Sequence, residues 1–78
     1  MDKYIIMAKN DKKQNVFLMI DSWSTGYPYF AKDIEKAKIF YSIKEAKKYW
    51  SDCKAFCKRY PVDSISIIEL FYKEIEKL

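Results

Sequence analysis

The stretch from Ser42 to Tyr60 constrains the fold of this chain most strongly, because it predicts one long amphipathic helix. Ser42 and Glu45 have the spacing of a capping box, in which each side chain satisfies an amide that the first helical turn leaves unpaired. Pro61 ends the helix, since proline cannot continue it. Apolar side chains recur between these ends at helical spacing and form one stripe: Ala46, Tyr49, Trp50, Cys53, Phe56, Cys57 and Tyr60.

Two short apolar runs near the N-terminus predict an antiparallel hairpin. They cover residues 4–8 and 15–21, and the polar connection between them contains Asn10 and Asp11, which favour turns. The second run is apolar on both faces, as expected of a strand that is covered on both sides. Its two alternating sets are Val16, Leu18 and Ile20 on one face, and Phe17 and Met19 on the other.

The remaining segments carry weaker signals. Pro28 removes a backbone donor, so residues 27–30 are expected to form a loop or an edge strand. A helical turn is expected within residues 31–38 and a short strand over residues 37–40, leading into the helix. Alternation from Ser64 favours a strand to about Phe71. A helix competes for this last segment, because Ile67, Phe71, Ile75 and Leu78 also share a helical face.

Together these elements predict a single small α+β domain spanning residues 1–78. It has an antiparallel sheet of three to four strands with one long amphipathic helix on one face, in the order β-β-(β)-α-β. Aromatic residues make up 18% of the 78 residues, which argues against disorder in so short a chain. One helix covers only one face of the sheet. The second face is expected to be covered by residues 22–36, by the C-terminal tail, by a second copy in a homodimer, or by another protein.

Composition excludes several kinds of chemistry. The chain has no histidine, which removes histidine-based acid–base catalysis, and its single glycine cannot build a glycine-rich phosphate loop. Cys53 and Cys57 are expected to be reduced thiols in the core, since two ligands fall short of a zinc site. We therefore expect no enzyme, no metal and no cofactor. Without a signal peptide or a long apolar run, a soluble cytoplasmic protein with no membrane partner is expected.

Two sets of side chains are candidates for binding. Residues 42–60 carry five lysines and one arginine against two acids, so an acidic partner or nucleic-acid phosphates would be sought there. Aromatic side chains near Pro28 are candidate anchors for a protein partner. The anionic-partner candidates are Lys44, Lys47, Lys48, Lys54, Lys58 and Arg59, and the anchor candidates are Trp23, Tyr27 and Tyr29.

Two motifs carry a resemblance to a known group of proteins. They are Trp23-x-x-Gly26-Tyr27-Pro28 and Ala37-Lys38-Ile39-Phe40-x-Ser42-x-x-Glu45-Ala46. With the hairpin before them, they resemble small proteins of unknown function encoded by phages and prophages of low-GC Gram-positive bacteria. The resemblance implies a phage accessory role in the host cytoplasm, in which the protein binds and inhibits a host protein, a defence nuclease or the replication machinery. A nucleic-acid-binding accessory protein is the alternative expectation.

Overall fold

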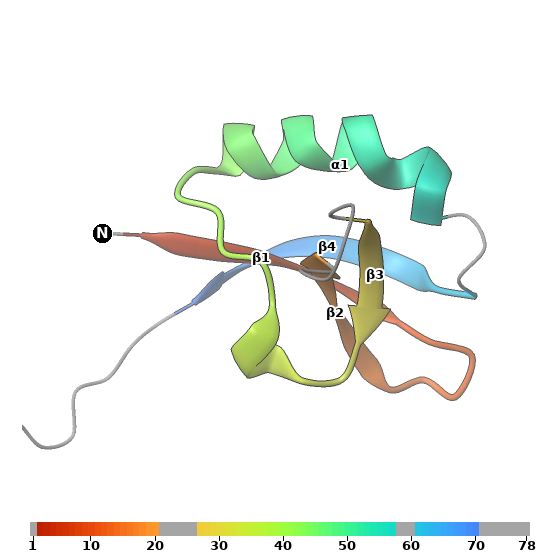
Figure 1. The fold of residues 1–78 in the computed structure, drawn as a ribbon. Coiled ribbons are helices and arrows are strands. Elements are labelled where there is room, and N and C mark those ends of the chain that lie inside the picture. The colour runs from red at the N-terminus through yellow and green to blue at the C-terminus, as the bar shows by residue number, and fades with distance from the viewer. Residues whose placement is uncertain (1, 21–26, 58–60, 71–78) are drawn as a thin grey trace, which may run out of the picture.

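The computed structural model of the protein describes residues 2–20, 27–57 and 61–70, which form a four-stranded antiparallel sheet with an α-helix across one face (Figure 1). The strand order in the sheet is β3-β2-β1-β4, so β3 and β4 are its two edges. The α+β fold predicted from the sequence is therefore confirmed. Its elements are β1 (Lys3–Lys9), β2 (Asn15–Ile20), β3 (Pro28–Ala31), the 3₁₀-helix η1 (Ile34–Lys36), α1 (Ile43–Cys57) and β4 (Asp63–Leu70).

The strands follow the sequence pattern closely. β1 and β2 form the predicted hairpin, and Asn10 organises its turn because its side-chain oxygen accepts the backbone N–H groups of Lys12 and Gln14, both at 2.9 Å. The segment at Pro28 is an edge strand rather than a loop. Residues 63–70 form a strand and not the competing helix, while residues 71–78 lie outside the described part.

The helix begins as its capping residues predict. The Ser42 hydroxyl accepts the Glu45 backbone N–H at 3.0 Å, and the Glu45 carboxylate accepts the N–H of Tyr41, the residue before the cap, at 3.2 Å. α1 then continues to Cys57. The predicted end at Tyr60 falls outside the described residues.

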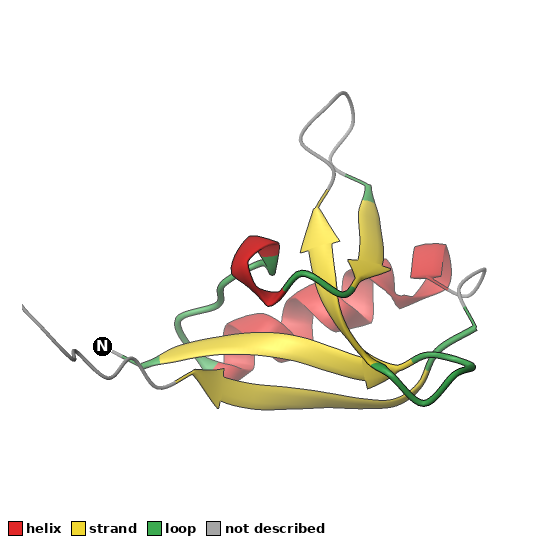
Figure 2. Ribbon diagram, turned by 90° about the horizontal axis from the view of Figure 1, so that it is seen from below, coloured by secondary structure: helices red, strands yellow, loops and turns green. Residues whose placement is uncertain are grey.

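The segment between η1 and α1 passes through a gap in the sheet. β1 and β2 pair only over residues 7–9 and 15–17 and then diverge (Figure 2). Residues 38–40 lie in this gap, where the Lys38 N–H donates to the Leu18 carbonyl at 2.9 Å and Phe40 exchanges two backbone hydrogen bonds with Tyr4. The short strand predicted over residues 37–40 is therefore wrong, because the segment crosses from one face of the sheet to the other and makes only an isolated bridge.

This crossing gives the sheet a core on each face. On the α1 side, the buried residues include Ile6, Leu18 and Phe40, packed against the helix. On the other side, Ala37 packs against Phe17 and Met19, with η1 beside β2. Several covers were expected for the second face of β2, including the same chain, a second copy and another protein. In the structure, residues of the same chain just after β3 cover it.

Candidate functional site

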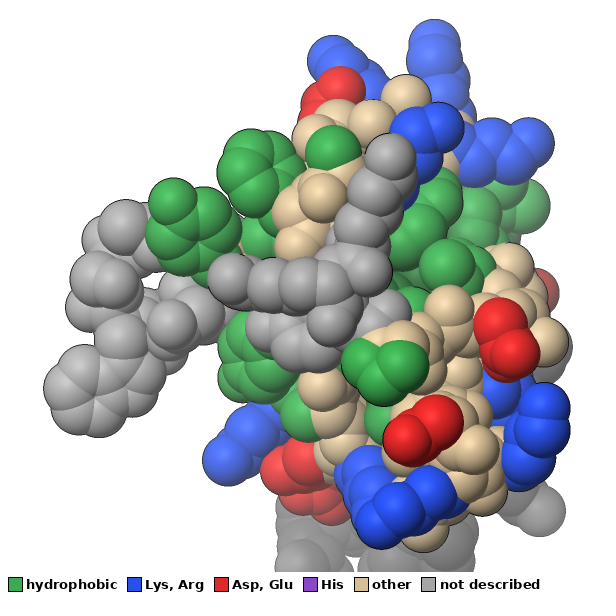
Figure 3. All heavy atoms as spheres, turned by 90° about the vertical axis from the view of Figure 1, so that its right-hand side faces the viewer, with side chains coloured by type: hydrophobic (Ala, Val, Ile, Leu, Met, Phe, Trp, Pro, Cys, Tyr) green, Lys and Arg blue, Asp and Glu red, His purple; other side chains and the backbone are tan. Residues whose placement is uncertain are grey.

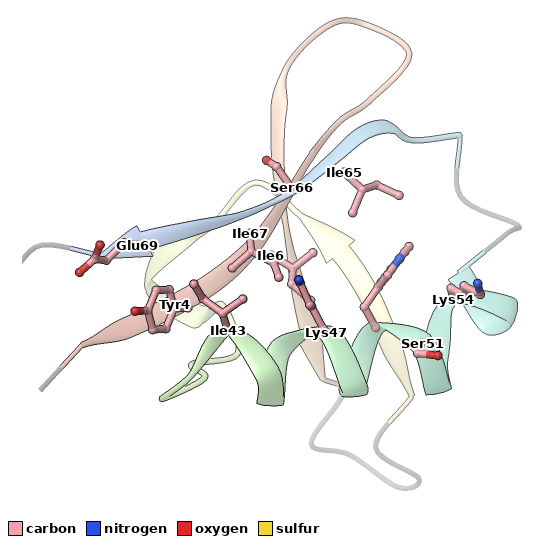
Figure 4. A pocket seen from close by; sticks show the side chains of 11 residues that line it. Tyr4, Ile6, Ile43, Lys47, Ser51, Lys54, Ile65, Ser66, Ile67 and Glu69 are labelled. Carbon is pink, nitrogen blue, oxygen red and sulfur yellow. The ribbon is translucent and has the colours of Figure 1, made fainter.

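A groove runs between α1 and the edge strand β4, because α1 lies mainly over β1 and β3 and leaves much of β4 uncovered. Its volume is about 620 Å³. The buried Ile6 forms part of its floor, and side chains of α1 and β4 form its walls (Figure 4). The lining residues are Tyr4, Ile6, Ile43, Lys47, Trp50, Ser51, Lys54, Ile65, Ser66, Ile67 and Glu69.

Large apolar side chains in the groove are open to solvent. Ile43 on the helix is 48% exposed, and Ile65 on β4 is 40% exposed. Trp50 is half-buried, since one side of its indole packs edge-on against Phe30 with ring centroids 6.1 Å apart. Exposed aliphatic surface next to an aromatic side chain is typical of a site that binds another molecule.

The charges in the groove are unevenly distributed. Glu69 lies at the same end as Tyr4 and Ile43, whereas Lys54 lies at the end nearer Ile65 (Figure 4). Partial burial, followed by the carboxylates of Asp2 and Glu69, raises the pKa of Tyr4. With Lys47 and Lys54 against one carboxylate, the groove has a net positive charge that favours an acidic ligand.

The structure divides the predicted lysines into two pairs. Lys47 and Lys54 line the groove, at helical spacing from Ile43 and Trp50. Lys44 and Lys48 are exposed but do not line it. Lys58 and Arg59 lie outside the described residues. In the view of Figure 3, lysine side chains surround the top of the molecule, and hydrophobic side chains remain visible below them.

The opposite flank of α1 has a different character. Glu45, Tyr49, Asp52 and Phe56 repeat there at helical spacing, so both acids of the helix lie away from the groove. Phe56, predicted to be part of the buried stripe, is 54% exposed, and its only described ring contact is with Tyr27 at 6.0 Å. That prediction is wrong because the helix rests on the sheet through Ala46, Cys53 and Cys57.

Tyr27 and Tyr29, the predicted aromatic anchors among the described residues, do not form one surface. Tyr27 is 48% exposed and lies against Phe56. Tyr29 is half-buried and packs against the core on the face opposite the helix. Trp23 lies outside the described residues. Neither Tyr27 nor Tyr29 lines the groove.

The two cysteines are buried and form no disulfide, as expected of reduced thiols in the core. Burial, reinforced by the neighbouring Cys57, raises the pKa of Cys53 to about 12. A thiol nucleophile needs the opposite shift, because the thiolate is the reactive form. Within the described ranges, no three Cys, Asp or Glu side chains gather where they could share a metal ion.

The sequence contains a partial signal for the groove. Ile43 stands seven residues before Trp50, at the edge of the apolar stripe of the helix, and Ile65 and Ile67 share one face of the last strand. Periodicity shows that these residues are apolar but does not show where the helix lies on the sheet. Only that position decides which of them stay uncovered.

Neither helical segment in the described part of the chain has the length and apolar character needed to cross a bilayer. Comparison of the chain with known protein families, with curated proteins and with solved structures gives no match.

Proposed function

We propose that this protein is a non-enzymatic interaction module that binds another protein through the groove between α1 and β4. The observation that supports the proposal most directly is the exposed apolar surface of Ile43 and Ile65 beside Lys47 and Lys54. An apolar centre with a charged rim is the usual composition of a protein-binding surface. The lysines would steer an acidic partner towards it.

The biological role that we propose follows from the resemblance in the sequence. As a phage-encoded accessory protein, it would act in the host cytoplasm by binding and modulating a host protein or a defence system. The groove between α1 and β4 fits a protein that acts by occupying a surface of its target.

The test is affinity capture from host lysate with matched variants. Ile65→Asp places a charge in the groove, whereas Ile34→Asp makes the same change at a side chain that is 44% exposed in η1, outside the groove. We expect wild type and Ile34→Asp to retain a stoichiometric partner and Ile65→Asp to lose it. Circular dichroism and thermal melts confirm that both variants are folded. Equal retention by both variants would show that the groove is not the binding surface.

Nucleic-acid binding is the alternative function, and the four exposed lysines of α1 favour it. Phosphate binding depends on the number of cations and falls steeply with salt. Reversing Lys44 and Lys48 to glutamate would then weaken affinity for mixed-sequence DNA or RNA as much as reversing Lys47 and Lys54. The protein-binding proposal predicts that only the second pair matters, and that partner capture is unaffected by nuclease treatment.

A further inference from the structure

The two edges of the sheet differ in how they are protected. β3 is only four residues long and begins with Pro28, which has no backbone N–H to donate. β4 is eight residues long and contains neither proline nor lysine, the residues that commonly protect an edge from further pairing. Among the described residues, no strand pairs with the outer side of β4. Within the described part of the chain, this edge is therefore open to another strand.

The register shows which backbone groups point outwards. Tyr4 directs its N–H and C=O to Phe40, on the side of β1 away from β4. Successive residues of a strand alternate, so Lys3 and Ile5 direct theirs to their partners in β4, Leu70 and Ile68. The β4 residues between and beside these partners, Glu69 and Ile67, must then direct their backbone groups to the open edge.

The same β4 residues carry the side chains that line the groove. Ile65, Ile67 and Glu69 lie on the face of β4 towards α1, whereas Ile68 and Leu70 pack on the opposite face. A strand added to this edge would place its alternate side chains beside Ile65 and Ile67 and within reach of the long lysine side chains of the helix.

We propose that the partner of this groove is an extended acidic segment of another protein, which adds to the sheet as a fifth strand beside β4. The inference rests on the proposed function and specifies how the partner is recognised. Backbone pairing to Ile67 and Glu69 supplies affinity. Apolar side chains of the segment cover Ile65 and Ile67, and its carboxylates pair with Lys47 and Lys54.

Charge distinguishes this occupant from a second copy of the chain. Antiparallel pairing of two β4 strands about a two-fold axis puts both helices on the same face of the joined sheet. Lys47 and Lys54 of both copies would then line a common trough, with only the two Glu69 carboxylates among the groove residues to offset them. An acidic segment compensates the lysines instead of doubling them.

The experiment uses fluorescent blocked peptides of about ten residues, long enough to span β4. Threonine occupies every second position, and valine and glutamate alternate at the remaining positions, so the repeat is Thr-Val-Thr-Glu. A control peptide has lysine in place of each glutamate. By fluorescence anisotropy at low salt, the glutamate peptide is expected to bind at least about tenfold more tightly. Lys47→Glu with Lys54→Glu should reverse this preference, whereas Lys44→Glu with Lys48→Glu should keep it.

Backbone pairing is tested with two N-methylated glutamate peptides. One is methylated at the valine and glutamate positions, and the other at the threonines. Only alternate amides of an added strand face its neighbour, so methylation of one set should weaken binding at least about tenfold and methylation of the other should not. In the complex, hydrogen exchange at the Ile67 and Glu69 amides should slow.

Failure can be assigned to one proposal or the other. Equal binding of the two methylated peptides, no preference for glutamate, or no binding of any peptide overturns strand addition. A wild-type dimer in light scattering that Ile65→Asp makes monomeric also overturns it and assigns the edge to a second copy. If lysate capture still depends on Ile65 in these cases, the interaction module stands and only its mode of recognition is wrong.

Discussion

Replacing Phe40 with alanine tests whether the segment that crosses the sheet is essential to the core. The Phe40 side chain is fully buried and lies 5.4 Å from the Tyr49 ring, centroid to centroid. A phenylalanine buries about 150–250 Å², which at about 25 cal/mol per Å² gives an upper bound of about 4–6 kcal/mol. Measured Phe→Ala losses in cores are about 3–5 kcal/mol. A chain of 78 residues has a total stability of only about 4–12 kcal/mol.

Urea unfolding monitored by circular dichroism measures this loss. With a slope of about 1 kcal/mol per M for a chain of this size, the midpoint for Phe40→Ala should fall by about 3 M or more. The control is Tyr41→Ala, because Tyr41 is the next residue and is 56% exposed, so its replacement should change stability by less than about 0.5 kcal/mol. A loss below about 1 kcal/mol for Phe40→Ala would refute the packing of this segment between β1 and β2.

Three further predictions concern the cap, the thiol and the groove. Ser42→Ala removes the acceptor of the Glu45 N–H and should lower the unfolding free energy by about 1 kcal/mol in urea titrations. Because the pKa of Cys53 is raised to about 12 from 9.0, folding stability should fall as pH rises between these values, by up to about 1.4 kcal/mol per pH unit, and Cys53→Ala should remove that part of the slope. Ile6→Val should cost about 0.5–1.5 kcal/mol, whereas Ile65→Val should cost clearly less, since Ile65 is 40% exposed; equal losses would mean that Ile65 is packed in solution.

Local patterns predicted the elements well because each is specified by residues close together in sequence. Ser42 and Glu45 fixed the start of α1, and Asn10 favoured the hairpin turn. Alternation from Ser64 to about Phe71 predicted a strand, and the structure has β4 at Asp63–Leu70. The two-faced apolar pattern of β2 correctly indicated that both of its faces are covered.

The amino-acid sequence by itself therefore determined the number and type of most elements, the cap of the helix and the burial of the two thiols. Only the tertiary structure decided that residues 38–40 pass between β1 and β2 and that the helix leaves much of β4 uncovered. It also decided that Lys47 and Lys54, but not Lys44 and Lys48, line the groove. Periodicity shows in which direction a side chain points from the axis of its own helix or strand. The lateral position of one element on another depends on the summed packing of side chains that are distant in sequence.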